Sequence, residues 1–381
     1  MDPNDDSCPA EHWLIPHIRA VQAETAQARS RAKEADDGPS IAIFDPAEVR
    51  RKLPSCRGFE MGDNDFEVGN AGRPPASDAL AEWQTKLNEI LDDRRGARRR
   101  LVVADDQLLD RLTAVKKQCP GFEIVSDLVI RTASLSAKTQ SPLKLPAMLL
   151  VGPAGVGKTH FARKLAAGLQ VPLEFVCGDL LSDRGTLTGL SPAWRAAKTG
   201  RIAAVLLESL VASPLFIVDE VDKVSAIHQH ENPLAFLHSV LEPENAKRFT
   251  DEYLCFPIRA DHAFWILTAN SATALSPSIL DRLVILPINP PDQAAMMVIV
   301  RNIYRDANVC CSNWFDPNPN ADVVAALARH NPRRVTKLVD FALGFAAKDG
   351  RNFLNIKDIE SSLSFMDLHE GKEKRIGFLT G

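Results

Sequence analysis

Several kinds of sequence feature are missing from this 381-residue chain, and each absence excludes a class of protein. No apolar run approaches the roughly 20 residues that a membrane-spanning helix needs, so we expect no membrane segment. The chain starts with Met1-Asp2-Pro3-Asn4-Asp5-Asp6, which is acidic and therefore unlike a secretory signal. The net charge of -4 predicts no overall attraction to nucleic acid. These features together predict a cytoplasmic protein.

The seven cysteines form no CxxC pair, and their number is odd. This scattered spacing excludes a disulfide framework and a cysteine-based zinc site. The chain also has no internal repeat. Its 45% hydrophobic and 25% charged residues are typical of a globular protein with a full core.

The N-terminal third has two parts. Residues 1–76 are weakly patterned: a helical stretch is expected over 18–35, and the prolines and glycines after it predict breaks and linkers. This segment is expected to be partly disordered. Residues 77–118 are predicted to be helical, with a helix that starts near Ser77 and a second one over 106–117.

A run of arginines lies between these two helices, at positions 94, 95, 98, 99 and 100. Such runs are usually solvated helix faces or linkers, although they can also bind nucleic acid.

Residues 119–290 alternate between short apolar runs and helical segments. The predicted strands are 148–151, 173–177, 215–219, 264–269 and 283–288. Five such strands with interleaved helices predict an α/β fold, a parallel five-stranded sheet covered by helices on both faces. Residues 291–369 are predicted to form a small all-helical domain, and residues 370–381 a tail.

A phosphate-binding loop follows the first of these strands. The motif G-x-x-x-x-G-K-[ST] is matched by Gly152, Pro153, Ala154, Gly155, Val156, Gly157, Lys158 and Thr159. Glycines let the backbone N–H groups wrap around phosphates, and the start of the next helix favours an anion. Lys158 is expected to neutralise the phosphates of ATP, and Thr159 to ligate Mg²⁺. His160 adjoins the loop and is included with it, although a polar first-turn residue needs no chemical role.

Polar side chains follow two further strands. They lie at the carboxyl ends of the strands, where a parallel sheet binds its ligands. Asp219 and Glu220 end one strand: Asp219 is expected to hold Mg²⁺, and Glu220 to polarise the attacking water. Asn270 ends another strand and is expected to orient that water or to contact the γ-phosphate. We therefore predict ATP and Mg²⁺ as the ligands of this edge.

Two arginines complete the set of candidate residues. Arg282 could pair locally with Asp281 or reach the γ-phosphate bound by a neighbouring subunit. Arg333 stands at the start of a C-terminal helix, where the helix dipole does not favour a cation, and it could fold over the nucleotide.

The order of these motifs resembles that of AAA+ ATPases. In that family they are Walker A, Walker B, sensor 1 (Asn270), the arginine finger (Arg282) and sensor 2 (Arg333), and the helical domain is a lid. From about 120 to 365 the closer resemblance is to the ATPase module of Lon proteases. Segments that carry it include 216–223, 232–244, 249–254 and 279–282.

This resemblance implies two further properties. Trp194 falls on the position of the aromatic residue with which such ATPases grip polypeptide in a central channel, although it could equally anchor its own loop. Lon carries a protease domain after its lid, whereas this chain ends at Gly381, so no peptidase activity is expected.

The leading interpretation is a homo-oligomeric ring, a hexamer by resemblance, that uses ATP to remodel or unfold a protein substrate or to serve an adaptor. One alternative is a DNA-associated loader or translocase, which the arginine run would support. The other is a switch that cycles between ATP and ADP states. Stimulation of ATP hydrolysis by unfolded protein or by DNA would separate the first two.

Overall fold

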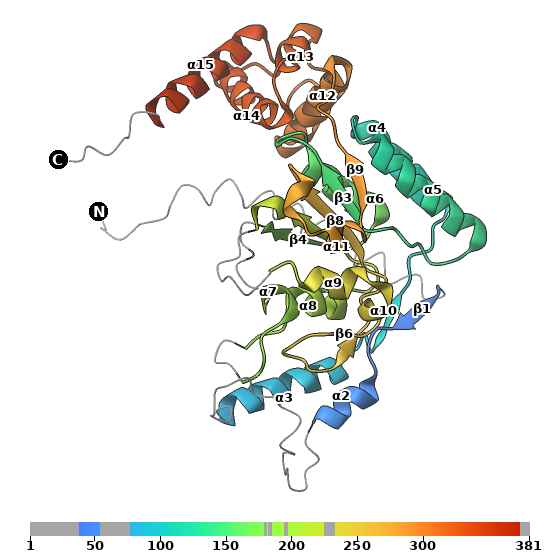
Figure 1. The fold of residues 1–381 in the computed structure, drawn as a ribbon. Helices are drawn as coiled ribbons and strands as arrows, with labels where there is room; N and C mark the ends of the chain where they lie inside the picture. The colour runs from blue at the N-terminus through green and yellow to red at the C-terminus, as the bar shows by residue number, and fades with distance from the viewer. Residues whose placement is uncertain are drawn as a thin grey trace, which may run out of the picture.

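The computed structural model describes residues 38–53, 77–178, 181, 185–193, 197–224 and 233–373. In Figure 1 a central sheet lies between a group of C-terminal helices at one end of the molecule and the first N-terminal helices at the other. The predicted helix over 18–35 falls outside the described residues. None of the helices within them is long and apolar enough to cross a membrane.

The central sheet has five parallel strands in the order β4-β5-β8-β3-β9. Their bounds are Met148–Val151 (β3), Leu173–Cys177 (β4), Leu215–Asp219 (β5), Phe264–Ala269 (β8) and Val284–Pro287 (β9). The predicted parallel five-stranded sheet is confirmed.

Side chains of the inner strands β5, β8 and β3 alternate between two separate apolar layers. On β5, Phe216 and Val218 belong to one layer, and Leu215 and Ile217 to the other. Because both faces are covered, the strand has no polar face and is a continuous apolar run. Helices therefore lie on both sides of the sheet, as predicted.

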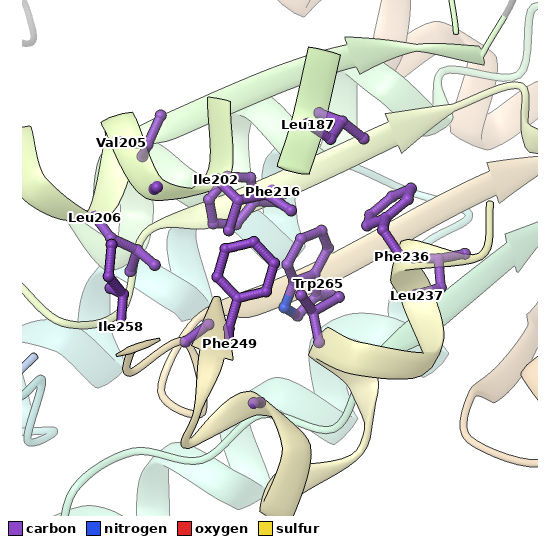
Figure 2. Packing of buried hydrophobic residues seen from close by; sticks show 14 of the residues in the cluster. Leu187, Ile202, Val205, Leu206, Phe216, Phe236, Leu237, Phe249, Ile258 and Trp265 are labelled. Atoms are coloured by element: carbon purple, nitrogen blue, oxygen red, sulfur yellow. The ribbon is translucent and has the colours of Figure 1, made fainter. Parts of the chain in front are cut away.

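The first layer is covered by the helices α3 (Ser77–Asp92), α8 (Arg201–Glu208) and α9 (Phe236–Leu241). Figure 2 shows its centre, where Phe216 of β5 stacks on Trp265 of β8 with ring centroids 4.5 Å apart. Small elements complete this side: α7 (Gly185–Thr188), η2 (Val221–Lys223), α10 (Pro243–Ala246), β6 (Phe249–Thr250), β7 (Pro257–Ile258), η3 (Ala272–Ala274) and α11 (Pro277–Leu280).

The second layer is covered by α4 (Asp106–Gln118), α5 (Glu123–Thr139) and α6 (Lys158–Leu169). Asp105 caps α4 by accepting a hydrogen bond from the backbone N–H of Leu108 at 2.7 Å. The rings of Phe122 and Phe161 stack 4.5 Å apart and tie the start of α5 to α6.

Part of the weakly patterned N-terminal segment is folded. Residues 38–53 form β1 (Ser40–Ala42) and α2 (Pro46–Lys52), and β1 pairs antiparallel with β2 (Arg98–Arg100). Ile43 and Val49 are fully buried in the first layer. Apolar residues so close to linker-like sequence are ordered because they pack on the sheet domain.

The C-terminal helices form a third, separate core. They are α12 (Gln293–Cys310), α13 (Ala321–Leu327), α14 (Pro332–Lys348) and α15 (Ile356–Glu373). Asn331 caps α14, and its side chain accepts from the backbone N–H of Arg334 at 2.9 Å. This cap fixes the start of α14, and therefore the place of Arg333.

Candidate nucleotide site

The phosphate loop leads from β3 into α6 through a close backbone approach. A Cβ on Gly152 would lie 2.2 Å from the carbonyl oxygen of Ile288, so only glycine fits there. Gly157 precedes α6 with φ at +100°, a conformation that favours glycine. No side chain caps the start of α6, and the N-terminus of a helix favours an anion.

Lys158 points back across this loop. Its Nζ donates to the carbonyl oxygens of Gly152 at 2.6 Å and Pro153 at 3.1 Å, and to Oδ1 of Asn270 at 3.3 Å. Burial lowers the pKa of Lys158, and the nearby carboxylates of Asp219, Asp222 and Glu220 oppose that shift. The two predicted residues Lys158 and Asn270 therefore meet in one place.

Asp219 lies directly opposite the first turn of α6. Its Oδ1 accepts hydrogen bonds from the hydroxyls of Thr159 at 2.8 Å and Thr268 at 2.5 Å. A carboxylate and a hydroxyl oxygen are the ligand types that Mg²⁺ prefers. The residues predicted to hold the metal are in contact, and they fit the chemistry of that ion.

Glu220 stands one residue beyond the strand, in a left-handed conformation with φ at +54°. Its carboxylate pairs with Lys223 at 2.7 Å, and its backbone N–H donates to the Thr268 hydroxyl at 3.0 Å. A Cβ on Gly178 would lie 2.5 Å from the Glu220 carbonyl oxygen, so the neighbouring strand end also requires glycine. The backbone around Glu220 is thus fixed from two sides.

Two residues that help to build this edge are not predicted from the sequence. Thr268 bridges Asp219 and Glu220, as described above. The sequence feature that could have pointed to it is a lone hydroxyl within an apolar strand. Asp222, whose sequence context is typical of a solvated residue, accepts from the backbone N–H of Asn270 at 3.1 Å. It therefore joins the end of β5 to the end of β8.

A cavity of about 410 Å³ adjoins the phosphate loop. One wall is the loop itself, with Thr159, His160, Asp219 and Glu220. The opposite wall comes from the turn at residues 118–122 and from the C-terminal helices α12 and α14, including Arg333. Its volume lies within the usual range for small-molecule sites, and the residues present fit ATP with Mg²⁺.

The C-terminal helices are attached to the sheet domain around this cavity. Asn302 of α12 donates from Nδ2 to the carbonyl oxygen of Gln118 at 2.8 Å, and Asp306 pairs with Lys164 of α6 at 3.1 Å. The next residue, Arg334, points away from the cavity and pairs with Asp367 of α15 at 2.8 Å. Of these two arginines, Arg333 is the one that lines the cavity beside the phosphate loop.

Arg282 is not among the described residues that line this cavity. Its guanidinium pairs with Glu242 at 3.2 Å and donates to the carbonyl oxygen of Ser278. The observed partner is Glu242 rather than Asp281, the local partner considered from the sequence. Arg282 is therefore held away from the cavity of its own chain.

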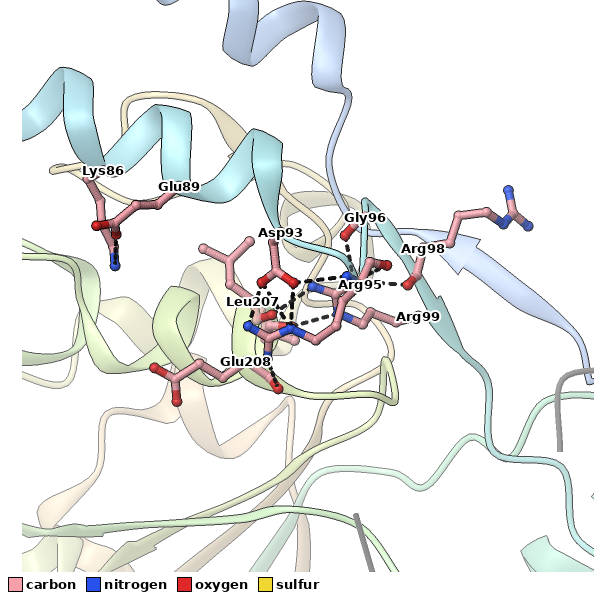
Figure 3. A network of polar contacts seen from close by, with 10 residues as sticks. Lys86, Glu89, Asp93, Arg95, Gly96, Arg98, Arg99, Leu207 and Glu208 are labelled. Carbon is pink, nitrogen blue, oxygen red and sulfur yellow. Dashed lines mark hydrogen bonds and ion pairs between the residues drawn. The ribbon is translucent and has the colours of Figure 1, made fainter. Parts of the chain in front are cut away.

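The arginine run is built into the fold. Arg99 is 2% exposed and donates to the carbonyl oxygens of Gly96 at 2.8 Å and Leu207 at 2.7 Å (Figure 3). Burial lowers the pKa of Arg99 to about 10. Arg95 pairs with Asp93 and donates to the carbonyl oxygen of Glu208, while Arg98 donates to that of Ser40 at 2.6 Å. Three of the five arginines thus hold β2 against β1 and the end of α8.

Trp194 lies outside the described residues. The described parts of its loop are residues 189–193 and 197–200, whose two ends meet: the backbone N–H of Leu190 donates to the carbonyl oxygen of Lys198 at 3.0 Å.

Comparison with known proteins agrees with this geometry. Residues 148–287 match the family model described as "ATPase family associated with various cellular activities (AAA)". The chain contains an AAA ATPase domain. This AAA domain lies within a region related to Lon proteases. The Lon protease of Chloroflexus aurantiacus is 28% identical over 291 residues, 73% of this chain and 33% of the relative. The peroxisomal Lon protease homolog 2 of Danio rerio is 33% identical over 213 residues, 54% of this chain and 22% of the relative.

The chain spans about a third or less of the length of these curated relatives. Among solved structures, the RuvB Holliday junction branch migration motor of Thermotoga maritima is similar, with 16% identity and a TM-score of 0.43. That match covers 64% of this chain and 68% of the motor.

Proposed function

We propose that this protein hydrolyses Mg-ATP at the edge formed by the phosphate loop, β5 and β8, and that a ring of its copies uses the energy to remodel a protein substrate. The observation that carries the hydrolytic part is the contact of Thr159 with Asp219 beside Lys158, Asn270 and Glu220. This set supplies a phosphate cradle, two oxygen ligands for a metal and a carboxylate for the water.

Each residue then has a separate role in the reaction. Lys158 and the N–H groups of the loop stabilise the negative charge of the β- and γ-phosphates. Mg²⁺, when bound, supplies further neutralisation of that charge. Glu220 accepts a proton from the attacking water, and Asn270 orients that water. Arg333 contacts the nucleotide from the lid domain, residues 291–369, so that nucleotide turnover moves the lid relative to the sheet.

Arg282 is proposed to act on the nucleotide of a neighbouring subunit. The absence of Arg282 from the described lining of its own cavity supports this role, because an arginine that serves in trans is not needed in its own site. A contact of this head-to-tail kind closes into a ring when the rotation between subunits allows it. The number of subunits, six, is carried over from the resemblance alone.

A protein substrate is favoured over DNA. The relatedness to Lon supports it, and three arginines of the run that would support DNA binding have structural partners instead. The loop that carries Trp194 is the proposed contact with the substrate.

The test is the ATPase rate of the wild type and of Trp194→Ala, each alone, with an unfolded protein and with double-stranded DNA. We expect stimulation by the unfolded protein, lost in Trp194→Ala. Stimulation by DNA alone, unaffected by the substitution and steeply dependent on salt, would replace this proposal with a nucleic-acid-coupled function. A slow basal rate indifferent to both additions would favour a nucleotide-dependent switch.

A further inference from the structure

The loop at residues 189–200 leaves and re-enters the sheet domain through a narrow neck. A Cβ on Gly200 would lie 2.3 Å from the backbone nitrogen of Gly189, so the two ends of the loop touch through backbone atoms. Gly189 has φ at +84°, which also favours glycine. The neck is therefore fixed by two glycines and by the bridge between Leu190 and Lys198.

The side chain of Asp251 contacts this neck at Gly189 and Gly200. Its Oδ2 accepts from the backbone N–H of Gly200 at 2.8 Å. Its Oδ1 accepts from the backbone N–H groups of Tyr253 and Leu254, both at 3.0 Å. A Cβ on Gly189 would lie 2.6 Å from Oδ1, so the carboxylate fills the space that a side chain would occupy. One carboxylate therefore joins the neck to the turn at residues 251–254.

Asp251 is fully buried, yet the proposed hydrolysis does not use it. Within the described residues, no lysine or arginine contributes to its pKa; backbone N–H groups and burial dominate. Burying a carboxylate without a cation is costly, so only its hydrogen bonds to the backbone offset the penalty. Such an arrangement fixes two backbone segments relative to each other.

The same turn is attached to the N-terminal region. Trp83 of α3 is 6% exposed and donates from Nε1 to the carbonyl oxygen of Tyr253 at 2.6 Å. Next to it, the backbone N–H of Glu252 donates to the carbonyl oxygen of Thr188, one residue before the neck. Three segments distant in sequence thus meet at one turn: α3, the start of the loop and its end.

We propose that Asp251 is a positioning residue that holds the two ends of the 189–200 loop together, so that the loop can act on a protein substrate. The part of this inference that concerns the action of the loop on a substrate rests on the proposed function. The part that concerns the structure of the neck is independent of it. Removing the carboxylate uncouples the loop from the sheet domain, while the nucleotide site keeps all of its contacts.

Asp251→Asn is the sharpest variant, because the side chain keeps its shape. Its NH₂ group must face either the N–H of Gly200, which loses one bond, or the N–H groups of Tyr253 and Leu254, which loses two. The matched control is Asp358→Asn in α15. Asp358 is a carboxylate 3% exposed that accepts from Arg351 at 2.7 Å and from the backbone N–H of Asn355 at 2.8 Å, far along the chain from the loop.

The experiment measures amide hydrogen exchange and ATPase rates on the same full-length proteins. In Asp251→Asn we expect exchange at Leu190 and Gly200 to accelerate about tenfold or more beyond any acceleration in β5, which reports global stability. The basal kcat and the KM for ATP should stay within about twofold of wild type, while stimulation by unfolded protein falls to the level of Trp194→Ala. Asp358→Asn should keep both the exchange at the neck and the stimulation.

Unchanged exchange at the neck in Asp251→Asn would overturn the inference. A parallel fall in basal rate and stimulation would also overturn it, because that pattern indicates general damage to the fold. If the wild type is not stimulated by unfolded protein, the proposed function fails, and the exchange at the neck alone still decides whether Asp251 holds the loop.

Discussion

Two aspartates in this AAA domain accept several hydrogen bonds each, but from different kinds of donor. Asp219 accepts from the hydroxyls of Thr159 and Thr268 beside the nucleotide cavity. Asp251 accepts from three backbone N–H groups and is fully buried. A hydroxyl can rotate and offer its own lone pairs to a metal, whereas a backbone N–H can only donate.

This difference separates a carboxylate that can change partners from one that cannot. At Asp219 the same oxygens can serve hydroxyls or a cation, which suits a site that binds and releases Mg-ATP. At Asp251 any change of partner would leave buried N–H groups without an acceptor, at a cost of about 1–3 kcal/mol each. Substitutions at the nucleotide edge should therefore change rates, and substitutions at the buried contacts should change stability.

The largest effect is expected for Arg282→Ala. If Arg282 stabilises the transition state in a neighbouring subunit, turnover should fall by roughly 10³-fold or more while ATP binding remains. Arg94→Ala, which removes another exposed arginine, is the control and should keep its rate. Normal turnover of Arg282→Ala would count against action in trans. So would a mixture of Arg282→Ala and Lys158→Ala that regains no activity.

Glu220→Gln should give the next largest effect. The amide cannot accept a proton from water, so kcat should fall by about 10²–10⁴-fold with ATP affinity preserved. The control is Glu244→Gln, an exposed glutamate of α10. Steady-state turnover and nucleotide binding measured on both variants decide the point; normal turnover would remove Glu220 as the residue that activates water.

Arg99→Met tests the buried arginine rather than the site. Its loss leaves the carbonyl oxygens of Gly96, Leu206 and Leu207 without a donor, so we expect the free energy of unfolding to fall by about 2–4 kcal/mol. Urea unfolding measures this change. The second measurement is the salt dependence of DNA affinity in Arg99→Met and in the wild type. If the variant had a weaker salt dependence and unchanged stability, Arg99 would contact DNA instead.

The smallest expected effect is the pH dependence that Asp251 contributes. Burial raises the pKa of Asp251 from 3.8 to about 6, against the opposing effect of three N–H donors. The folded protein then binds this proton more tightly than the unfolded chain does. The resulting stabilisation is full below about pH 3.8 and is lost as the pH rises through about 6.

This direction of the pH dependence can be measured by comparing the wild type with Asp251→Asn. Between pH 4 and pH 7 the free energy of unfolding of the wild type should fall, relative to that of Asp251→Asn, by on the order of 2–3 kcal/mol. Urea unfolding of both proteins at the two pH values gives the difference. A difference that does not change with pH would mean that Asp251 has the same pKa in the folded and unfolded states.

The sheet could be predicted from the sequence because each strand is a short apolar run that ends at a polar residue. The strands 173–177, 215–219 and 264–269 have the predicted bounds. The helix α5 is not predicted, because its sequence mixes β-branched residues with serine and threonine and shows no clear period. It is helical because one face packs on α4.

The site was predictable where a motif is continuous in sequence or where a polar residue ends a strand or begins a helix, as with Asn270 and Arg333. The phosphate loop and the end of β5 are such motifs, whereas Thr268 and Asp222 take their places through contacts between strands. The role of Asp251 depends on two glycines 11 residues apart that meet in space, a relation that neither periodicity nor spacing indicates. The arginine run shows the same limit, because a cluster of charges gives no sign of which carbonyl groups surround Arg99.

Binding of ATP at the phosphate loop of this AAA domain can be measured by equilibrium titration of a fluorescent ATP analogue with Mg²⁺ into the wild type, Lys158→Ala and Lys247→Ala. Lys247 is an exposed lysine that pairs with Glu244 at 2.6 Å, so its removal should not affect binding. We expect saturable binding by the wild type and Lys247→Ala, and an affinity at least about tenfold lower in Lys158→Ala. Equally tight binding by Lys158→Ala would contradict this expectation and would place the nucleotide elsewhere.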